Sequence, residues 1–102
     1  MAYFSDLDIE IKEKQRFNGW SNYATWRINL EIFDNFDISD YDKTPYELSY
    51  QLKDYVDEIL FIDVPDGLAK DYAYAFIVEV NFYEIAEALL DAYIEEEEDE
   101  TL

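Results

Sequence analysis

The chain has 102 residues, of which 50% are hydrophobic and 19% aromatic, which suffices for one packed domain but not for two. It lacks cysteine and histidine, so disulfides, thiolate metal sites and histidine-based catalysis are excluded. Asp and Glu number 26 against 7 Lys and Arg, a formal net charge of −19, which argues against binding to DNA, RNA or anionic membranes.

The first 17 residues have a short alternating pattern. Leu7, Ile9 and Ile11 are separated by charged residues, and this is the period of a β-strand. We therefore expect an extended arm or a short strand here. The dipeptide Asn18-Gly19 follows and predicts a turn.

A first helix is predicted after this turn, ending near residues 34–35. Ser21 or Asn22 is expected to cap it, because either side chain can accept a hydrogen bond from a free backbone N–H. Its predicted inner face follows helical spacing and is widened by Ile28 and Ile32. This face consists of Tyr23, Trp26, Leu30 and Phe33. Trp26 is therefore expected in the core, and Trp20 is expected to pack against the first turn.

A second helix is predicted to begin at the capping sequence of residues 44–47. Thr44 and Glu47 have capping-box spacing, and Pro45 suits the first helical position. The residues expected to face inward are Leu48, Leu52, Tyr55, Val56 and Ile59. The segment DVPDG, residues 63–67, is expected to end the helix.

Two further helices are predicted. One runs from about Leu68 to Val80, although its run AFIVEV is also compatible with a buried strand. Its expected inner face is formed by Leu68, Tyr72, Phe76 and Val80. Residues 81–84 resemble a cap, with Glu84 at the position that reaches back, and the last helix is expected to turn Ile85, Leu89 and Tyr93 inward.

These elements predict an all-α fold: a compact bundle of three to four amphipathic helices with an extended N-terminal arm or short strand. Residues 1–97 are expected to form a single acidic helical domain. Residues 98–102 are expected to be a frayed acidic tail, because like charges four residues apart repel one another.

The stretch NGWSNYATW, residues 18–26, resembles the signature N-G-W-[ST]-N-x-x-T-W of small proteins of unknown function encoded by phages and plasmids. Residues 80–87, VNFYEIAE, are similar to a second pattern of those proteins, V-N-W-x-E-I-A, with Phe82 in place of tryptophan. Between the two stretches the chain departs from the family in being unusually acidic. The resemblance implies a mobile-element origin and a helical fold, and it brings no catalytic assignment.

No arrangement of residues predicts an enzyme, a metal site or a cofactor. The 26 carboxylates contain no pair that the sequence marks out for acid–base chemistry. The aspartates between Asp37 and Asp42 invite a calcium site, but the pattern fails, since Pro45 and Gln51 stand where an EF-hand loop needs glycine and glutamate. Weak cation binding by this loop remains open.

The acids of the last helix form a pattern with a possible function. They recur at steps of three or four residues and so form one helical stripe: Glu84, Glu87, Asp91, Glu95 and Glu98. Asp54, Asp57 and Glu58 of the second helix are expected to extend it. A solvated helix face normally mixes both signs of charge, whereas no Lys or Arg follows Lys70 here.

The charge pattern favours a DNA mimic that blocks the nucleic-acid-binding channel of a basic host protein, with no direct nucleic-acid binding of its own. Given the resemblance, the expected target is a host defence nuclease, either a CRISPR effector or a restriction enzyme. The alternative is a small phage adaptor or regulatory protein that binds another protein through an apolar patch, with the charge serving solubility. With an acidic N-terminus and no apolar run of about 18–20 residues, the protein is expected in the host cytoplasm, where a dimer is possible.

Overall fold

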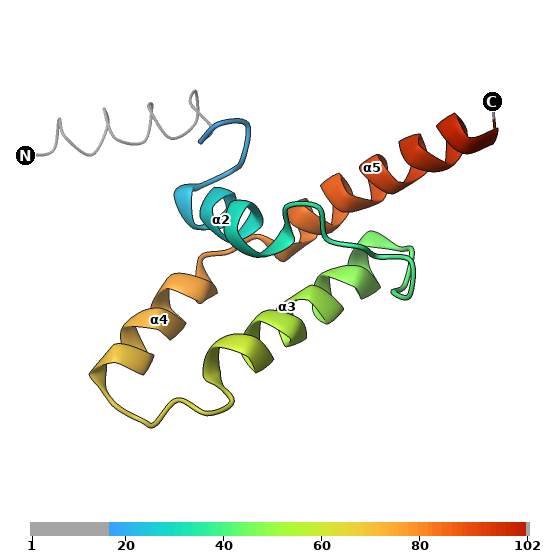
Figure 1. Cartoon of the computed structure of the whole chain (residues 1–102). Helices are drawn as coiled ribbons and strands as arrows, with labels where there is room; N and C mark the ends of the chain where they lie inside the picture. The colour runs from blue at the N-terminus through green and yellow to red at the C-terminus, as the bar shows by residue number, and fades with distance from the viewer. Residues whose placement is uncertain (1–16, 102) are drawn as a thin grey trace, which may run out of the picture.

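The computed structural model describes residues 17–101, with side chains described for residues 17–96. The expected N-terminal arm lies outside the described residues except for Phe17. The helical elements follow one another as α2 (Tyr23–Ile28), the π-helix η1 (Asn29–Phe33), α3 (Pro45–Phe61), α4 (Leu68–Val78) and α5 (Phe82–Thr101) (Figure 1). The predicted all-α fold is confirmed.

The predicted turn is a two-residue hairpin that positions the start of α2. Asn18 and Gly19 have φ angles of 48° and 90°, a left-handed pair that suits an Asn-Gly turn. The turn brings Phe17 and Trp20 opposite each other, and their backbones exchange hydrogen bonds of 2.7 and 2.8 Å. Asn22 then caps α2, because its side-chain oxygen accepts from the N–H of Thr25.

The inner face of the first helix differs from the prediction. Ala24, Thr25 and Ile28 are buried in α2, while Tyr23 and Leu30 are exposed. The small side chains at positions 24 and 25 allow close packing, and the wider π turn of η1 changes the spacing before Phe33 reaches the core.

The prediction that Trp26 enters the core is wrong. Trp26 is half-buried, and its ring lies 4.9 Å from that of Phe17 and 5.6 Å from that of Tyr23. These three rings form an aromatic cluster at the start of the described chain, beside the core. Trp20 is half-buried and packs against the core, whereas its packing against the first turn of α2 stays a prediction.

Helices α3 and α5 pack against each other and form the centre of the core. Leu48, Leu52 and Val56 of α3 are fully buried, as are Ile85 and Ala86 of α5. The inward side chains of α3 are as predicted up to Val56. Thr44 caps the helix and Pro45 opens it, also as predicted.

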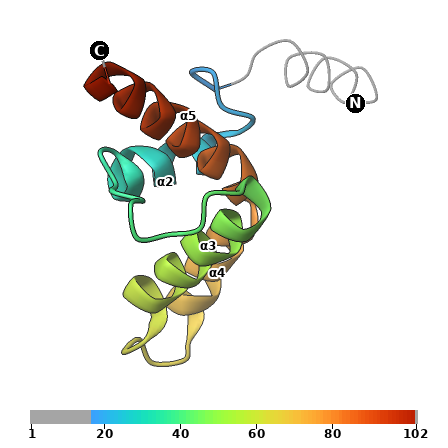
Figure 2. The ribbon, with the colours of Figure 1, turned by 90° about the vertical axis from the view of Figure 1, so that its right-hand side faces the viewer.

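Beyond Val56, the last turns of α3 leave α5 and form a hairpin with α4 (Figures 1 and 2). Phe61 of α3 and Tyr74 of α4 are in ring contact at 5.9 Å. Ile59 was predicted to face inward but is 49% exposed, because no further helix of the described chain covers it there.

Residues 68–78 form a helix and not a strand, but its predicted inner face is wrong. Leu68 and Tyr72 are 66% and 69% exposed. Among the residues of α4, all of which the structure describes, only Ile77 is buried, and Val80 follows it into the core. Since α4 is apolar on nearly every side, its sequence does not specify which side is covered.

Candidate functional site

The two stretches that carry the family resemblance lie against each other. Ser21 donates to one carboxylate oxygen of Glu84 from both its backbone N and its Oγ, at 3.0 and 2.8 Å. The side-chain amide of Asn22 donates to the carbonyl oxygen of Glu79 at 2.8 Å. The start of α2 is thereby bonded to the corner between α4 and α5, more than 50 residues along the chain.

Thr25 lies at the centre of this junction and is fully buried. Its Oγ1 donates to the side-chain oxygen of Asn22 at 2.7 Å and accepts from the backbone N–H of Asn81 at 2.8 Å. The side chain of Asn81 in turn accepts from the N–H of Glu84 at 3.1 Å. Ser21, Asn22, Thr25, Asn81 and Glu84 are thus used in holding the fold together.

The acidic stripe is carried by α5, which is one continuous helix of 20 residues (Figure 1). Glu87, Asp91 and Glu95 are exposed, while Ile85 and Leu90 are buried on the side that faces the core. Consecutive stripe residues four positions apart are separated by about 6 Å along the helix axis. These three carboxylates therefore form a regular anionic row.

The two ends of the predicted stripe differ from this row. Glu84 is half-buried, and its carboxylate accepts the two bonds from Ser21, so its contact is structural. The side chain of Glu98 lies outside the described side chains. The backbone of α5 is helical as far as Thr101, and fraying of the tail stays a prediction.

The acids of α3 were expected to extend the row of α5, and this stays a prediction. Asp54 and Glu58 are exposed. Asp57 is half-buried and bonded to Lys53 at 3.0 Å. This bond raises the pKa of Lys53 above its ordinary value.

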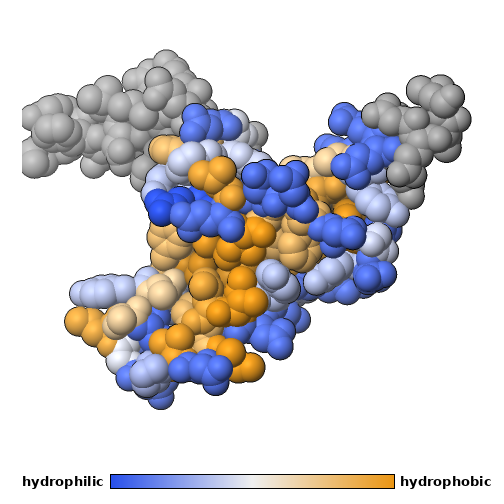
Figure 3. Space-filling model, viewed as in Figure 1, coloured by the Kyte–Doolittle hydropathy of each residue, from blue (hydrophilic) through white to orange (hydrophobic). Residues whose placement is uncertain are grey.

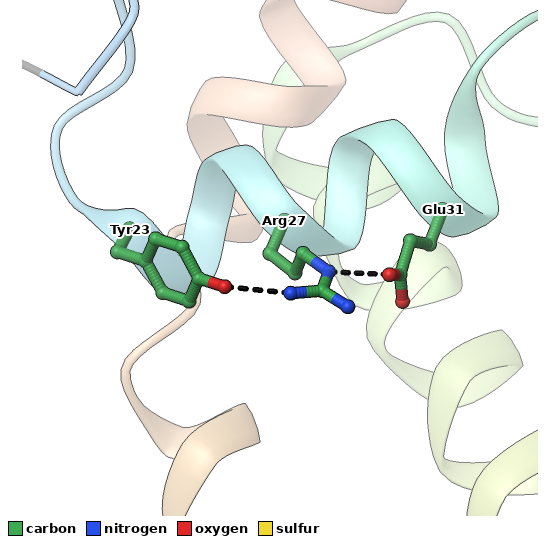
Figure 4. A network of polar contacts seen from close by, with 3 residues as sticks. All are labelled: Tyr23, Arg27 and Glu31. Carbon is green, nitrogen blue, oxygen red and sulfur yellow. Dashed lines mark hydrogen bonds and ion pairs between the residues drawn. The ribbon is translucent and has the colours of Figure 1, made fainter.

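Within residues 17–96, every basic side chain has an intramolecular polar contact. Arg27 donates to the hydroxyl of Tyr23 at 2.6 Å and to the carboxylate of Glu31, and both bonds run along one side of α2 and η1 (Figure 4). The bond to Glu31 is the main cause of the raised pKa of Arg27. Lys70 pairs with Asp66 at 3.2 Å.

Lys43 fastens the loop between η1 and α3. Its ammonium group donates to the carbonyl oxygens of Ile38, Ser39 and Tyr41, at 2.9, 3.1 and 2.5 Å. It also lies 5.1 Å from the ring centre of Tyr93 on α5. The loop is thus tied to α5 by a cation.

A second candidate surface is apolar. Figure 3 shows hydrophobic residues gathered on the side of the molecule seen in Figure 1, over α2 and the hairpin of α3 and α4. A pocket of about 540 Å³ opens there between these helices. Its apolar lining comprises Tyr23, Ile28, Ile32, Ile59, Leu60, Ala73, Phe76 and Ile77.

Phe76 lines the pocket, and exposed apolar residues precede it along α4. Phe76 lies one helical turn from Tyr72, and Tyr72 lies one turn from Leu68. We name the exposed part of this surface the α3–α4 apolar face, and define it by Ile59, Leu60, Ile62, Leu68 and Tyr72. This face was not predicted, although Lys70 and Asp71 are the only charged residues of α4 and this apolar composition was the available signal.

Comparison of the chain with models of protein families, with curated proteins and with solved structures finds no match. The mobile-element origin implied by the resemblance therefore stays a prediction. No helix of the described chain is long and apolar enough to cross a membrane. Among the described residues, no group of three or more acidic side chains is arranged to hold a metal ion.

Proposed function

We propose that the protein is an acidic DNA mimic that inhibits a host defence nuclease, a CRISPR effector or a restriction enzyme, by occupying its nucleic-acid-binding channel. The observation that carries this proposal is the exposed row of Glu87, Asp91 and Glu95 on the continuous helix α5. No Lys or Arg of the sequence follows Lys70, so this helix offers a single sign of charge.

The spacing of the row supports the proposal. Carboxylates four residues apart on a helix are about 6 Å apart along the axis. Every second phosphate of one DNA strand is about 6.8 Å further along the duplex axis. A channel whose lysines and arginines are spaced for phosphates therefore finds a similar density of negative charge on α5. Charge complementarity of this kind accelerates association.

The energetic cost of like charges on α5 supports the same proposal. Like charges at three- and four-residue spacing cost a helix a few tenths of a kcal/mol for each pair. An exposed face that serves only solubility is better built from both signs of charge. The carboxylates of α5 repel one another at this cost, and we therefore expect them to serve binding.

The test is inhibition of DNA cleavage by a panel of restriction enzymes and CRISPR effectors. The variant Glu87→Gln/Asp91→Asn/Glu95→Gln removes the row. We expect it to lose inhibition of whichever enzyme the unchanged protein inhibits, because the charges that occupy the channel are gone.

The matched control is Asp40→Asn/Asp63→Asn/Asp71→Asn. It changes the net charge by the same amount at exposed positions away from α5. This control should inhibit like the unchanged protein, and inhibition should weaken as salt is raised. Equal inhibition by the row variant, or no inhibition of any enzyme in the panel, would contradict the proposal.

The adaptor function is the second candidate, and the α3–α4 apolar face favours it. Exposed apolar areas of this kind mark protein-binding surfaces. In this alternative the protein binds another protein through Leu68 and Tyr72, and the acids of α5 keep it soluble. Binding by an adaptor would survive high salt and neutralisation of the row on α5.

A further inference from the structure

A pocket of about 420 Å³ lies between α5 and the end of η1 with the loop that follows it. This volume falls within the range of about 300–1,000 Å³ that is usual for ligand sites. Three half-buried aromatic residues contribute to its wall, namely Trp20, Phe36 and Tyr93. The pocket is therefore large enough, and its wall apolar enough, to hold the stem of a long side chain.

The charged residues that line this pocket all have the same sign. They are Asp34, Asp37 and Glu96, and each is exposed. The ion pairs between described side chains use other acids. Lys43 interacts electrostatically with Asp37, but its ammonium group is held by three backbone carbonyls and does not line the pocket. The polar side of the pocket is therefore anionic.

An aromatic wall beside carboxylates favours an organic cation. A metal ion fits less well, since no group of three or more acids in the described chain is arranged to hold one. The guanidinium group of arginine meets both features of the pocket. It is planar and weakly hydrated, so it stacks on aromatic rings, and its N–H groups donate to carboxylates in pairs.

We propose that this pocket takes an arginine side chain of the basic partner that the row on α5 binds, an inference that rests on the proposed function. The methylene stem of the arginine contacts the aromatic wall, and its guanidinium group donates to the carboxylates of Asp34 and Glu96. A long cationic side chain is thereby bound at both its apolar and its charged part.

The position of the pocket supports an occupant from the same partner. Trp20 and Ala88 also line a second pocket, of about 340 Å³, together with Glu87 and Asp91 of the row. The two pockets therefore share part of their walls and are neighbours along α5. A protein that covers the row of carboxylates reaches the larger pocket as well.

The first experiment titrates the isotope-labelled full chain with N-acetylarginine amide and follows the indole N–H signals by NMR. The sequence contains two tryptophans, Trp20 and Trp26, and Trp26 does not line the pocket. The signal of Trp20 should shift with a dissociation constant of about 1 mM, because a single side chain makes few contacts. The signal of Trp26 is the internal reference and should stay in place, and the variant Trp26→Phe assigns the two signals. An unmoved Trp20 signal would overturn the proposal.

Two further probes separate charge from shape. N-acetylcitrulline amide has the shape of the arginine compound without its charge, and its dissociation constant should be at least about 10-fold higher. N-acetyllysine amide has the charge without the planar group, and it should bind at least about threefold more weakly. Equal affinity for either probe would contradict the assignment of an arginine.

The second experiment locates the binding site with charge-neutral variants. Asp34→Asn/Glu96→Gln should raise the dissociation constant of the arginine compound at least about 10-fold. The matched control Glu58→Gln/Asp63→Asn removes the same charge at exposed positions outside the pocket, and it should change the constant less than about twofold.

The row variant Glu87→Gln/Asp91→Asn/Glu95→Gln distinguishes the two neighbouring pockets. It should retain the shift of Trp20, since none of its three positions lines the larger pocket. If the row variant lost the shift while the pocket variant kept it, arginine would bind in the second pocket, and the proposal would be overturned.

The pocket and the proposed function can fail separately. In the nuclease assay, the pocket variant should need about 10-fold more protein for half-inhibition, because it loses one anchor of the interface. Inhibition that is unchanged in this variant would refute only the arginine site. Arginine binding at Trp20 without inhibition of any nuclease would refute the proposed function and leave a guanidinium site whose partner is another basic protein.

Discussion

The prediction that tests the junction most directly is Thr25→Val. Valine keeps the shape of the buried side chain but removes the hydroxyl that donates to Asn22 and accepts from the N–H of Asn81. Each lost bond costs about 1 kcal/mol, and the N–H of Asn81 loses its partner in a part-buried position, so we expect the free energy of unfolding to fall by about 2 kcal/mol. For a domain of this size, that lowers Tm by about 8–16 °C.

Thr25→Ser is the matched variant. It keeps the hydroxyl and removes one buried methyl group, which costs about 1 kcal/mol. Urea unfolding followed by circular dichroism, at one fixed protein concentration, should therefore rank Thr25→Val as the less stable of the two. The opposite order, with Thr25→Val as stable as the unchanged protein, would show that packing and not hydrogen bonding holds α2 to the corner between α4 and α5.

Three further predictions concern stability and pH. The variant Glu87→Gln/Asp91→Asn/Glu95→Gln should raise the free energy of unfolding by about 0.5–1 kcal/mol at low salt, and the gain should shrink at high salt; urea unfolding at two salt concentrations measures it. Gly19→Ala should lower the free energy of unfolding by about 1 kcal/mol, because the φ angle of 90° at Gly19 is unfavourable for a residue with a Cβ. A clash is not the cause, since the added Cβ would meet no atom within 4 Å; a thermal melting curve measures the change. The pKa of Asp37 should lie below its ordinary value, because its carboxylate accepts a bond from the backbone N–H of Ser39. At pH values above the ordinary pKa of aspartate, this bond therefore stabilises the loop. The stabilisation is lost as the pH falls through the lowered pKa of Asp37, as carbon-detected NMR titration should show.

Much of the fold could be predicted because local signals specify helix ends. Asn22, Thr44 and Asn81 each accept a hydrogen bond from a backbone N–H three residues on, and a sequence contains this information directly. The positions of Leu52 and Ile85 were also predictable, because α3 and α5 each have one clearly apolar side.

The orientation of α2 and α4 could not be predicted, because neither helix has one clearly apolar side. Trp26 is in phase with Leu30, but the small residues Ala24 and Thr25 form the covered side. On α4, Leu68 and Ile77 lie on opposite sides and are equally apolar, so only the surrounding structure decides which is buried.

The candidate site was predictable only in part. The row on α5 follows from helical spacing, and Glu87, Asp91 and Glu95 are exposed on α5. The role of Glu84 was not predictable, since its partner Ser21 lies 63 positions away. Hydrogen bonds over such a distance depend on how whole helices pack, and no local pattern contains that information.

The use of the basic side chains has a thermodynamic consequence. Within residues 17–96, Arg27, Lys43, Lys53 and Lys70 are all committed to contacts inside the chain. Because none of these four cations pairs with Glu87, Asp91 or Glu95, small cations from the solution contribute to screening that row. When a polycationic protein replaces those ions, they return to the bulk, so the association we propose should be driven by entropy more than by enthalpy.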